Sequence, residues 1–93
     1  MVVGVLTITL SIPAANSLKD KRQVVKSLVD SIRQRFNVSA AETEDNDTWR
    51  RATLGVAVVS NSQRVANQVL DKVGDFVESN PLISVISLEL EFV

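Results

Sequence analysis

Hydrophobic and polar residues alternate along the first stretch of the chain, residues 2–12. Alternation with a period of two, in a stretch rich in β-branched residues, is typical of a strand that buries one face. Pro13 ends this stretch, because proline has no amide hydrogen to donate to a sheet. The same pattern returns at residues 38–43, 51–59 and 82–93, so the sequence predicts four strands.

Two segments between these strands have the helical period instead. Residues 18–36 carry their apolar side chains on one arc, with Ser17 placed to cap the start and Asn37 to cap the end in a left-handed conformation. Residues 62–79 carry a second apolar stripe, which stops before Pro81. The sequence therefore predicts two amphipathic helices, each with a single face to bury.

The predicted elements follow the order strand–helix–strand–strand–helix–strand, within one α+β domain that covers residues 1–93. Because both helices have one apolar stripe, both are expected on the same face of a single antiparallel sheet. Right-handed crossovers then place the first and third strands in the centre and predict the order 4-1-3-2. This arrangement is the ferredoxin-like split βαβ fold, βαββαβ. In the last strand, one face is expected to carry Leu82, Ser84, Ile86, Leu88, Leu90 and Phe92.

The composition limits the chemistry that this domain can perform. The chain has no cysteine, histidine or tyrosine, which removes the thiol nucleophile, the disulfide and the imidazole base or metal ligand. Its three glycines are isolated, so no glycine-rich phosphate loop is present. We therefore expect a non-enzymatic protein with no cofactor. The first apolar stretch is too short to span a bilayer and lacks a basic leader, so we expect a cytoplasmic protein outside the membrane.

Charge is segregated along the chain, although the net charge is only −1. Between residues 17 and 37, six basic residues and two acids give +4, and between residues 38 and 48, four acids and no base give −4. Close carboxylates can hold Ca²⁺ or Mg²⁺, but the acidic run lacks the glycine and the terminal glutamate of an EF-hand. No metal site is expected, and the run is interpreted as a turn that favours solubility.

The basic cluster opens the first predicted helix, where each exposed cation opposes the helix dipole at a cost of about 0.3–1 kcal/mol. One outward stripe of cations suits a phosphate backbone or an acidic protein. It consists of Lys19, Arg22, Lys26 and Arg33. Lys21 lies inside the apolar arc, so its stem is expected to reach over the sheet edge. The alternative interpretation is a solvated helix face that the acidic turn balances.

A tryptophan beside two arginines follows the acidic turn, at Trp49, Arg50 and Arg51. A ring in this setting can stack on a nucleic-acid base or on another ring. A tryptophan at the entrance to a strand more often covers one end of the core or an interface. The sequence leaves both interpretations open.

The sheet face away from the helices is predicted to be uncharged on its two central strands. It is expected to carry Val3, Val5, Thr7, Thr9, Ser11, Thr53, Gly55, Ala57 and Val59. RNA-binding sheets of this topology display aromatic residues on these strands, and none is present here. The face is therefore interpreted as the interface of a homodimer, with a mildly adhesive monomer as the alternative.

Four segments carry a recognisable sequence. They are Val2-Val3-Gly4-Val5-Leu6, Ser17-Leu18-Lys19-Asp20-Lys21-Arg22, Arg35-Phe36-Asn37-Val38-Ser39 and Trp49-Arg50-Arg51-Ala52-Thr53-Leu54-Gly55. With them the chain resembles, over essentially its whole length, the YlxP-like family of small bacterial proteins of uncharacterised function. The resemblance implies a ferredoxin-like fold. It also implies a connection with translation, from gene neighbourhoods shared with initiation and ribosome-maturation factors, and it supplies no catalytic residues.

Two functions follow as hypotheses. The leading one is a protein that binds RNA or a ribosomal component, with neither DNA nor a membrane as its partner. Its expected contacts are Lys19, Lys21, Arg22, Lys26, Arg33, Trp49, Arg50 and Arg51. The alternative is a homodimeric protein-interaction or small-ligand-sensing module that binds no nucleic acid. Its expected dimer face is Val3, Val5, Thr7, Thr9, Thr53, Ala57 and Val59.

Overall fold

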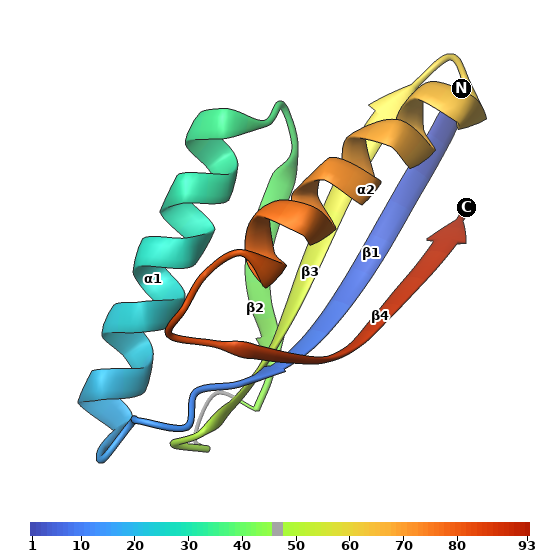
Figure 1. Ribbon diagram of the computed structural model, residues 1–93. Coiled ribbons are helices and arrows are strands. Elements are labelled where there is room, and N and C mark those ends of the chain that lie inside the picture. The colour runs from blue at the N-terminus through green and yellow to red at the C-terminus, as the bar shows by residue number, and fades with distance from the viewer. Residues whose placement is uncertain (46–47) are drawn as a thin grey trace.

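The computed structural model describes residues 1–45 and 48–93, and its elements follow the predicted order (Figure 1). They are β1 (Val2–Ser11), α1 (Leu18–Arg35), β2 (Ser39–Glu44), β3 (Arg51–Ser60), α2 (Gln63–Glu78) and β4 (Ser84–Phe92). Each boundary lies within two residues of the one predicted from the sequence pattern.

The four strands form one antiparallel sheet in the order β2-β3-β1-β4, which confirms the predicted order. β1 and β3 pair over their whole length, from Val2 opposite Ser60 to Ser11 opposite Arg51. Both helices lie on one side of the sheet (Figure 1). The fold is therefore the ferredoxin-like arrangement expected from the sequence.

The core fills the space between the helices and the sheet. The central strands turn every second side chain into it: Leu6, Ile8, Leu10, Leu54, Val56 and Val58. The helices contribute Val25, Leu28, Val29, Ile32, Ala66, Leu70, Val73 and Val77. Burial of one valine, leucine or isoleucine side chain stabilises a fold by about 1.5–3 kcal/mol. The alternation of the strands and the stripes of the helices thus specify which faces turn inward.

A serine caps the start of each helix. Ser17 Oγ accepts a hydrogen bond from the amide nitrogen of Asp20 at 3.1 Å, as the sequence predicts. Ser62 Oγ accepts the equivalent bond from Val65 at 3.3 Å. Each cap satisfies an amide that has no partner inside its helix, and such caps contribute about 0.5–2 kcal/mol.

The end of α1 differs from the prediction. Asn37 was expected to cap the helix in a left-handed conformation, but Phe36 already has an extended backbone, with φ −129°. Among the described residues, Asp45 is the non-glycine position with positive φ. Phe36 packs edge-on against Phe76 with 5.9 Å between ring centroids, and this contact with α2 accompanies the early exit from the helix.

A β-bulge interrupts the pairing of β4 with β1. Thr9 lies opposite Ser87, whereas the next residue, Leu10, lies opposite Val85, so Ile86 has no partner on β1. One extra residue inverts the alternation of a strand, so the side chains before and after a bulge follow opposite phases.

The bulge corrects the predicted face of the last strand. Three residues after it lie on the helix side of the sheet, as expected: Leu88, Leu90 and Phe92. Before it, Ile83 and Val85 pack against the core instead of Leu82 and Ser84, which are exposed. The apolar–polar alternation in this part of the chain was therefore assigned to the wrong face.

β1 and α2 approach closely at Gly4. A β-carbon built at this position would lie 2.9 Å from Cδ1 of Leu70 and 3.3 Å from Cε1 of Phe92. Leu70 is buried, so it has little room to move away. The missing side chain at Gly4 lets α2 lie directly against the central strand.

Candidate binding surface

Two loops are tied together at the end of the domain where α1 begins. The amide of Ile12 donates to the carbonyl of Arg50 at 2.8 Å, and Nε of Arg50 donates to the carbonyl of Ala15 at 2.9 Å. These bonds hold the loop between β1 and α1 against the residues that enter β3. Figure 1 shows both segments at the same end of the domain as the first turn of α1.

Four exposed side chains come from the segments that meet here, and we call them the basic end. They are Lys19, Arg22, Trp49 and Arg50. Trp49 has 53% of its surface exposed, so its ring lies outside the core. Within residues 1–45 and 48–93, none of the three cations has an ion-pair partner.

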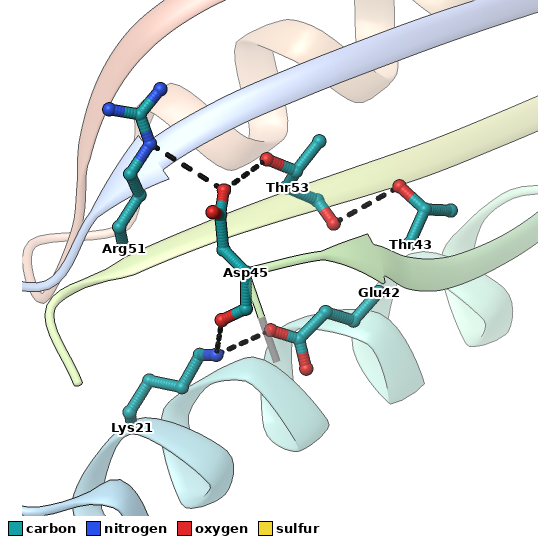
Figure 2. Close-up of polar contacts among 6 residues, drawn as sticks. All are labelled: Lys21, Glu42, Thr43, Asp45, Arg51 and Thr53. Carbon is teal, nitrogen blue, oxygen red and sulfur yellow. Dashed lines mark hydrogen bonds and ion pairs between the residues drawn. The ribbon is translucent and has the colours of Figure 1, made fainter. Parts of the chain in front are cut away.

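Lys21 is wholly buried, which corrects the expectation that its stem reaches over the sheet edge. Its Nζ lies 2.6 Å from Oε2 of Glu42 and donates to the carbonyl of Asp45, also at 2.6 Å (Figure 2). A buried ammonium group requires such partners, because removal from water is costly for a charge. Lys21 therefore fastens α1 to the end of β2. It is not among the residues that can contact a phosphate.

The contact with Glu42 has the geometry of an ion pair rather than of an aligned hydrogen bond. Oε2 of Glu42 is buried and accepts no hydrogen bond from the described part of the chain. The glutamate side chain as a whole keeps 19% exposure. The carboxylate is thus held mainly by the charge of Lys21, which makes it dependent on that one residue.

Asp45 connects the two faces of the sheet. Its backbone has φ 65°, a left-handed conformation that aspartate tolerates better than most residues. Its carbonyl accepts from Lys21, whereas its carboxylate accepts from Oγ1 of Thr53 at 2.8 Å and lies 3.5 Å from Nε of Arg51 (Figure 2). Arg51 is therefore held by Asp45, beside the open face of the sheet.

Arg33 and Lys26 also have partners within the protein. Arg33 donates from Nε and Nη2 to the carbonyl of Ala40 on β2, at 3.0 and 2.6 Å. Lys26 pairs with Asp30 one turn further along α1, at 2.9 Å. The hydrogen bond from Lys26, with the positive charges of Lys26 and Arg33, lowers the pKa of the Asp30 carboxyl. Arg33 therefore acts within the fold, whereas Lys26, with 80% exposure, remains accessible.

The open face of the sheet differs in two respects from the face expected from the sequence. Thr53 is 4% exposed, because it lies under the carboxylate of Asp45. β4 adds Glu89 opposite Thr7 and Glu91 opposite Val5, two charges that a view of the central strands alone omits. The centre of this face is uncharged, Val59 is 65% exposed, and one margin is acidic.

Sequence reasoning missed the roles of Glu42 and Asp45, which it assigned to a turn that favours solubility. One signal was present: the surplus of four positive charges at residues 17–37 is followed directly by a surplus of four negative charges at residues 38–48. Lys21 also stood inside the apolar arc of its helix, where a charge needs a partner.

The described residues offer neither a metal-binding cluster nor a membrane-spanning helix. Within 1–45 and 48–93, no three acidic side chains gather closely enough to hold a metal ion. Neither helix there combines the length and the hydropathy needed to cross a membrane.

Comparison with known proteins supports the fold and defines the family. Residues 3–90 match the family described as "Protein of unknown function (DUF503)". The uncharacterized protein YlxP of Bacillus subtilis (strain 168) is 41% identical over 69 residues, which make up 74% of this chain and 75% of the relative. A de novo designed protein with a ferredoxin fold, solved in solution by NMR, aligns with 98% of this chain and 85% of its own, with a TM-score of 0.55. At 12% identity, that likeness concerns the fold alone. The chain belongs to the DUF503 family, in agreement with its resemblance to YlxP-like proteins.

Proposed function

We propose that this protein is a non-enzymatic, cytoplasmic RNA-binding protein that acts on the ribosome or on structured RNA through its basic end. The observation that carries the proposal is an exposed Trp49 among cations that have no ion-pair partner in the described chain. Cations of the predicted binding set that serve the fold, Lys21 and Arg33 above all, are not part of this surface.

The chemistry of the basic end suits an unpaired stretch of RNA. Lys19 and Arg22 lie in the first turns of α1, where backbone amides and the helix dipole also favour an anion such as a phosphate. Trp49 offers a ring face on which an unstacked base can lie, an interaction that contributes about 1–3 kcal/mol per base. Among the described residues, Arg50 is held by Ala15 through Nε alone, so its terminal nitrogens remain for a phosphate.

Binding to purified ribosomal subunits and to a structured ribosomal RNA fragment, at low and moderate salt, tests the proposal. Binding is expected to weaken as salt rises, because bound phosphates release their counterions. Lys19→Glu with Arg22→Glu should weaken it about tenfold or more. The matched control is Arg64→Glu with Lys72→Glu, which changes the net charge equally at exposed positions of α2. No binding at low salt, or equal loss in both double variants, would contradict a specific basic end.

Trp49→Ala separates base stacking from charge. The variant should lose about 1–3 kcal/mol of binding, whereas Trp49→Phe should retain most of it, because phenylalanine also stacks. If Trp49→Ala bound RNA as tightly as the parent protein, the ring of Trp49 would have no part in binding.

A second candidate function is a homodimeric interaction module that uses the open face of the sheet. The uncharged centre of that face and the exposure of Val59 favour it. Sedimentation at high micromolar concentration measures the dimer directly. Thr7→Lys should dissociate it, and Glu89 opposite Thr7 should keep the folded monomer stable. An intact dimer in this variant would place the interface elsewhere.

A further inference from the structure

The helix side of β4 is only partly covered. Leu88 and Leu90 have exposures of 41% and 39%, although they lie opposite core residues of β1. Figure 1 shows β4 at the edge of the sheet, next to β1. A groove of about 400 Å³ separates β4 from α2. It is lined by Leu6, Leu70, Gly74, Leu88 and Leu90, with Asp71 and Asp75 on its rim.

The outer edge of β4 is open to another strand. β4 pairs with β1 on one side only, so a row of backbone donors and acceptors faces outward. Edge strands are usually protected by lysine, proline, an inward-pointing charge or a β-bulge. Ser84–Phe92 contains neither lysine nor proline, and its bulge at Ile86 leaves residues 87–92 in regular pairing with β1. The opposite edge differs, because Arg33 of α1 occupies the carbonyl of Ala40 on β2.

The charge around β4 is acidic and without an ion-pair partner in the described chain. Glu89 and Glu91 alternate with Leu88 and Leu90, so the two glutamates lie on the open face and the two leucines on the groove side. Asp71 and Asp75 add two carboxylates to the groove. A second copy paired through β4 would bring these acids together, whereas a basic segment would neutralise them.

We propose that β4 binds an extended, basic segment of a partner protein as a fifth strand. Alternate apolar side chains of that segment would cover Leu88 and Leu90 in the groove. The intervening lysines or arginines would lie beside Glu89 and Glu91 on the open face. This surface lies apart from the basic end, so the proposal does not depend on RNA binding.

A fluorescent nine-residue peptide that alternates valine and lysine is the probe. It should bind the full-length protein by fluorescence anisotropy, whereas a valine–glutamate peptide and a threonine–lysine peptide should bind at least about tenfold more weakly. Methylation of every second peptide nitrogen, in the phase that faces β4, should abolish binding, because a fifth strand needs those donors. Equal binding by the methylated or the glutamate peptide would overturn the proposal.

Variants of the protein locate the site. Glu89→Gln with Glu91→Gln should weaken binding about fivefold, from two cross-strand charge pairs of ~0.5 kcal/mol each. The control with the same change in net charge is Ser27→Lys with Gln34→Lys on α1, and it should bind as the parent does. Leu88→Ser with Leu90→Ser should remove binding while circular dichroism verifies the fold. The parent protein could instead form a dimer that Leu88→Ser with Leu90→Ser dissociates and the other variants do not. That result would show that a second copy binds at β4 and would overturn the proposal.

Discussion

The ammonium nitrogen of Lys21 lies 2.6 Å from Oε2 of Glu42, and the lysine side chain has no exposure to solvent. Lys21 comes from the first turn of α1, whereas Glu42 belongs to β2, an edge strand of the sheet. The pair therefore fixes a helix to a strand that has a sheet partner on one side only. Because a buried charge is costly without its counter-charge, the two residues depend on each other.

Loss of Lys21 alone should destabilise the fold. Lys21→Met leaves Glu42 without its cation, and the expected cost is about 3 kcal/mol, the lower end for a broken buried pair because Glu42 keeps some exposure. Lys21→Met combined with Glu42→Leu should recover most of this loss, since apolar pairs often replace buried ion pairs. Urea unfolding measures the free energies. A double variant that is as unstable as Lys21→Met would contradict the interdependence.

Asp45 is expected to tolerate only a narrow set of substitutions. Asp45→Ala removes the acceptor for Thr53. It also places alanine, which has no side chain able to stabilise a left-handed conformation, at φ 65°. The combined cost is about 2 kcal/mol. Asp45→Asn retains the acceptor and the backbone preference, loses only the partly exposed ion pair with Arg51, and should therefore lie near the parent. Asp45→Gly relieves the backbone alone and should fall between them. Thermal unfolding gives the order, and an alanine variant as stable as the asparagine variant would refute it.

Two glycine substitutions should have opposite signs. Gly4→Ala places a methyl group 2.9 Å from a buried leucine and should destabilise by about 1 kcal/mol. Gly74→Ala meets only Cδ1 of Leu88 at 3.5 Å, an ordinary contact, and should stabilise α2 by about 0.5–1 kcal/mol. The urea concentrations at the midpoint of unfolding compare the stabilities of the two variants, provided that the unfolding free energy depends equally on urea in both. If Gly4→Ala stabilised the protein as Gly74→Ala is expected to do, the contact of Gly4 with α2 would not limit the size of the side chain at this position.

Asp30 should give a small pH dependence at the acid end. The hydrogen bond and charge of Lys26, with Arg33, lower the pKa of Asp30 in the folded protein. Stability from this interaction is therefore complete above the unfolded pKa of about 3.9 and is lost as the pH falls through the lower folded value. An NMR titration of the carboxyl carbon measures the folded pKa. Lys26→Met should raise it toward the ordinary pKa of an aspartate, and an unchanged value would exclude Lys26 as the cause.

The sequence pattern predicts the elements, the sheet order and the inward faces of β1 and β3, because period and amphipathicity report directly on burial. It does not predict the bulge at Ile86, since an apolar residue continues the alternation whether or not it has a partner. It also does not predict the burial of Lys21, because that burial depends on how the end of β2, with Glu42 and Asp45, packs against α1. The cations of α1 look alike in sequence, and only tertiary contacts separate Arg33, held by Ala40, from Lys19 and Arg22.

The unpaired Ile86 also has a consequence for comparing relatives. Its neighbours Val85 and Ser87 are matched to consecutive residues of β1, so the two halves of β4 keep independent phases. A relative whose last strand runs without the bulge would be one residue shorter at this point. A correct alignment to such a relative opens a gap at Ile86, and an ungapped one would match the leucines on the helix side of β4 with the glutamates on its open face.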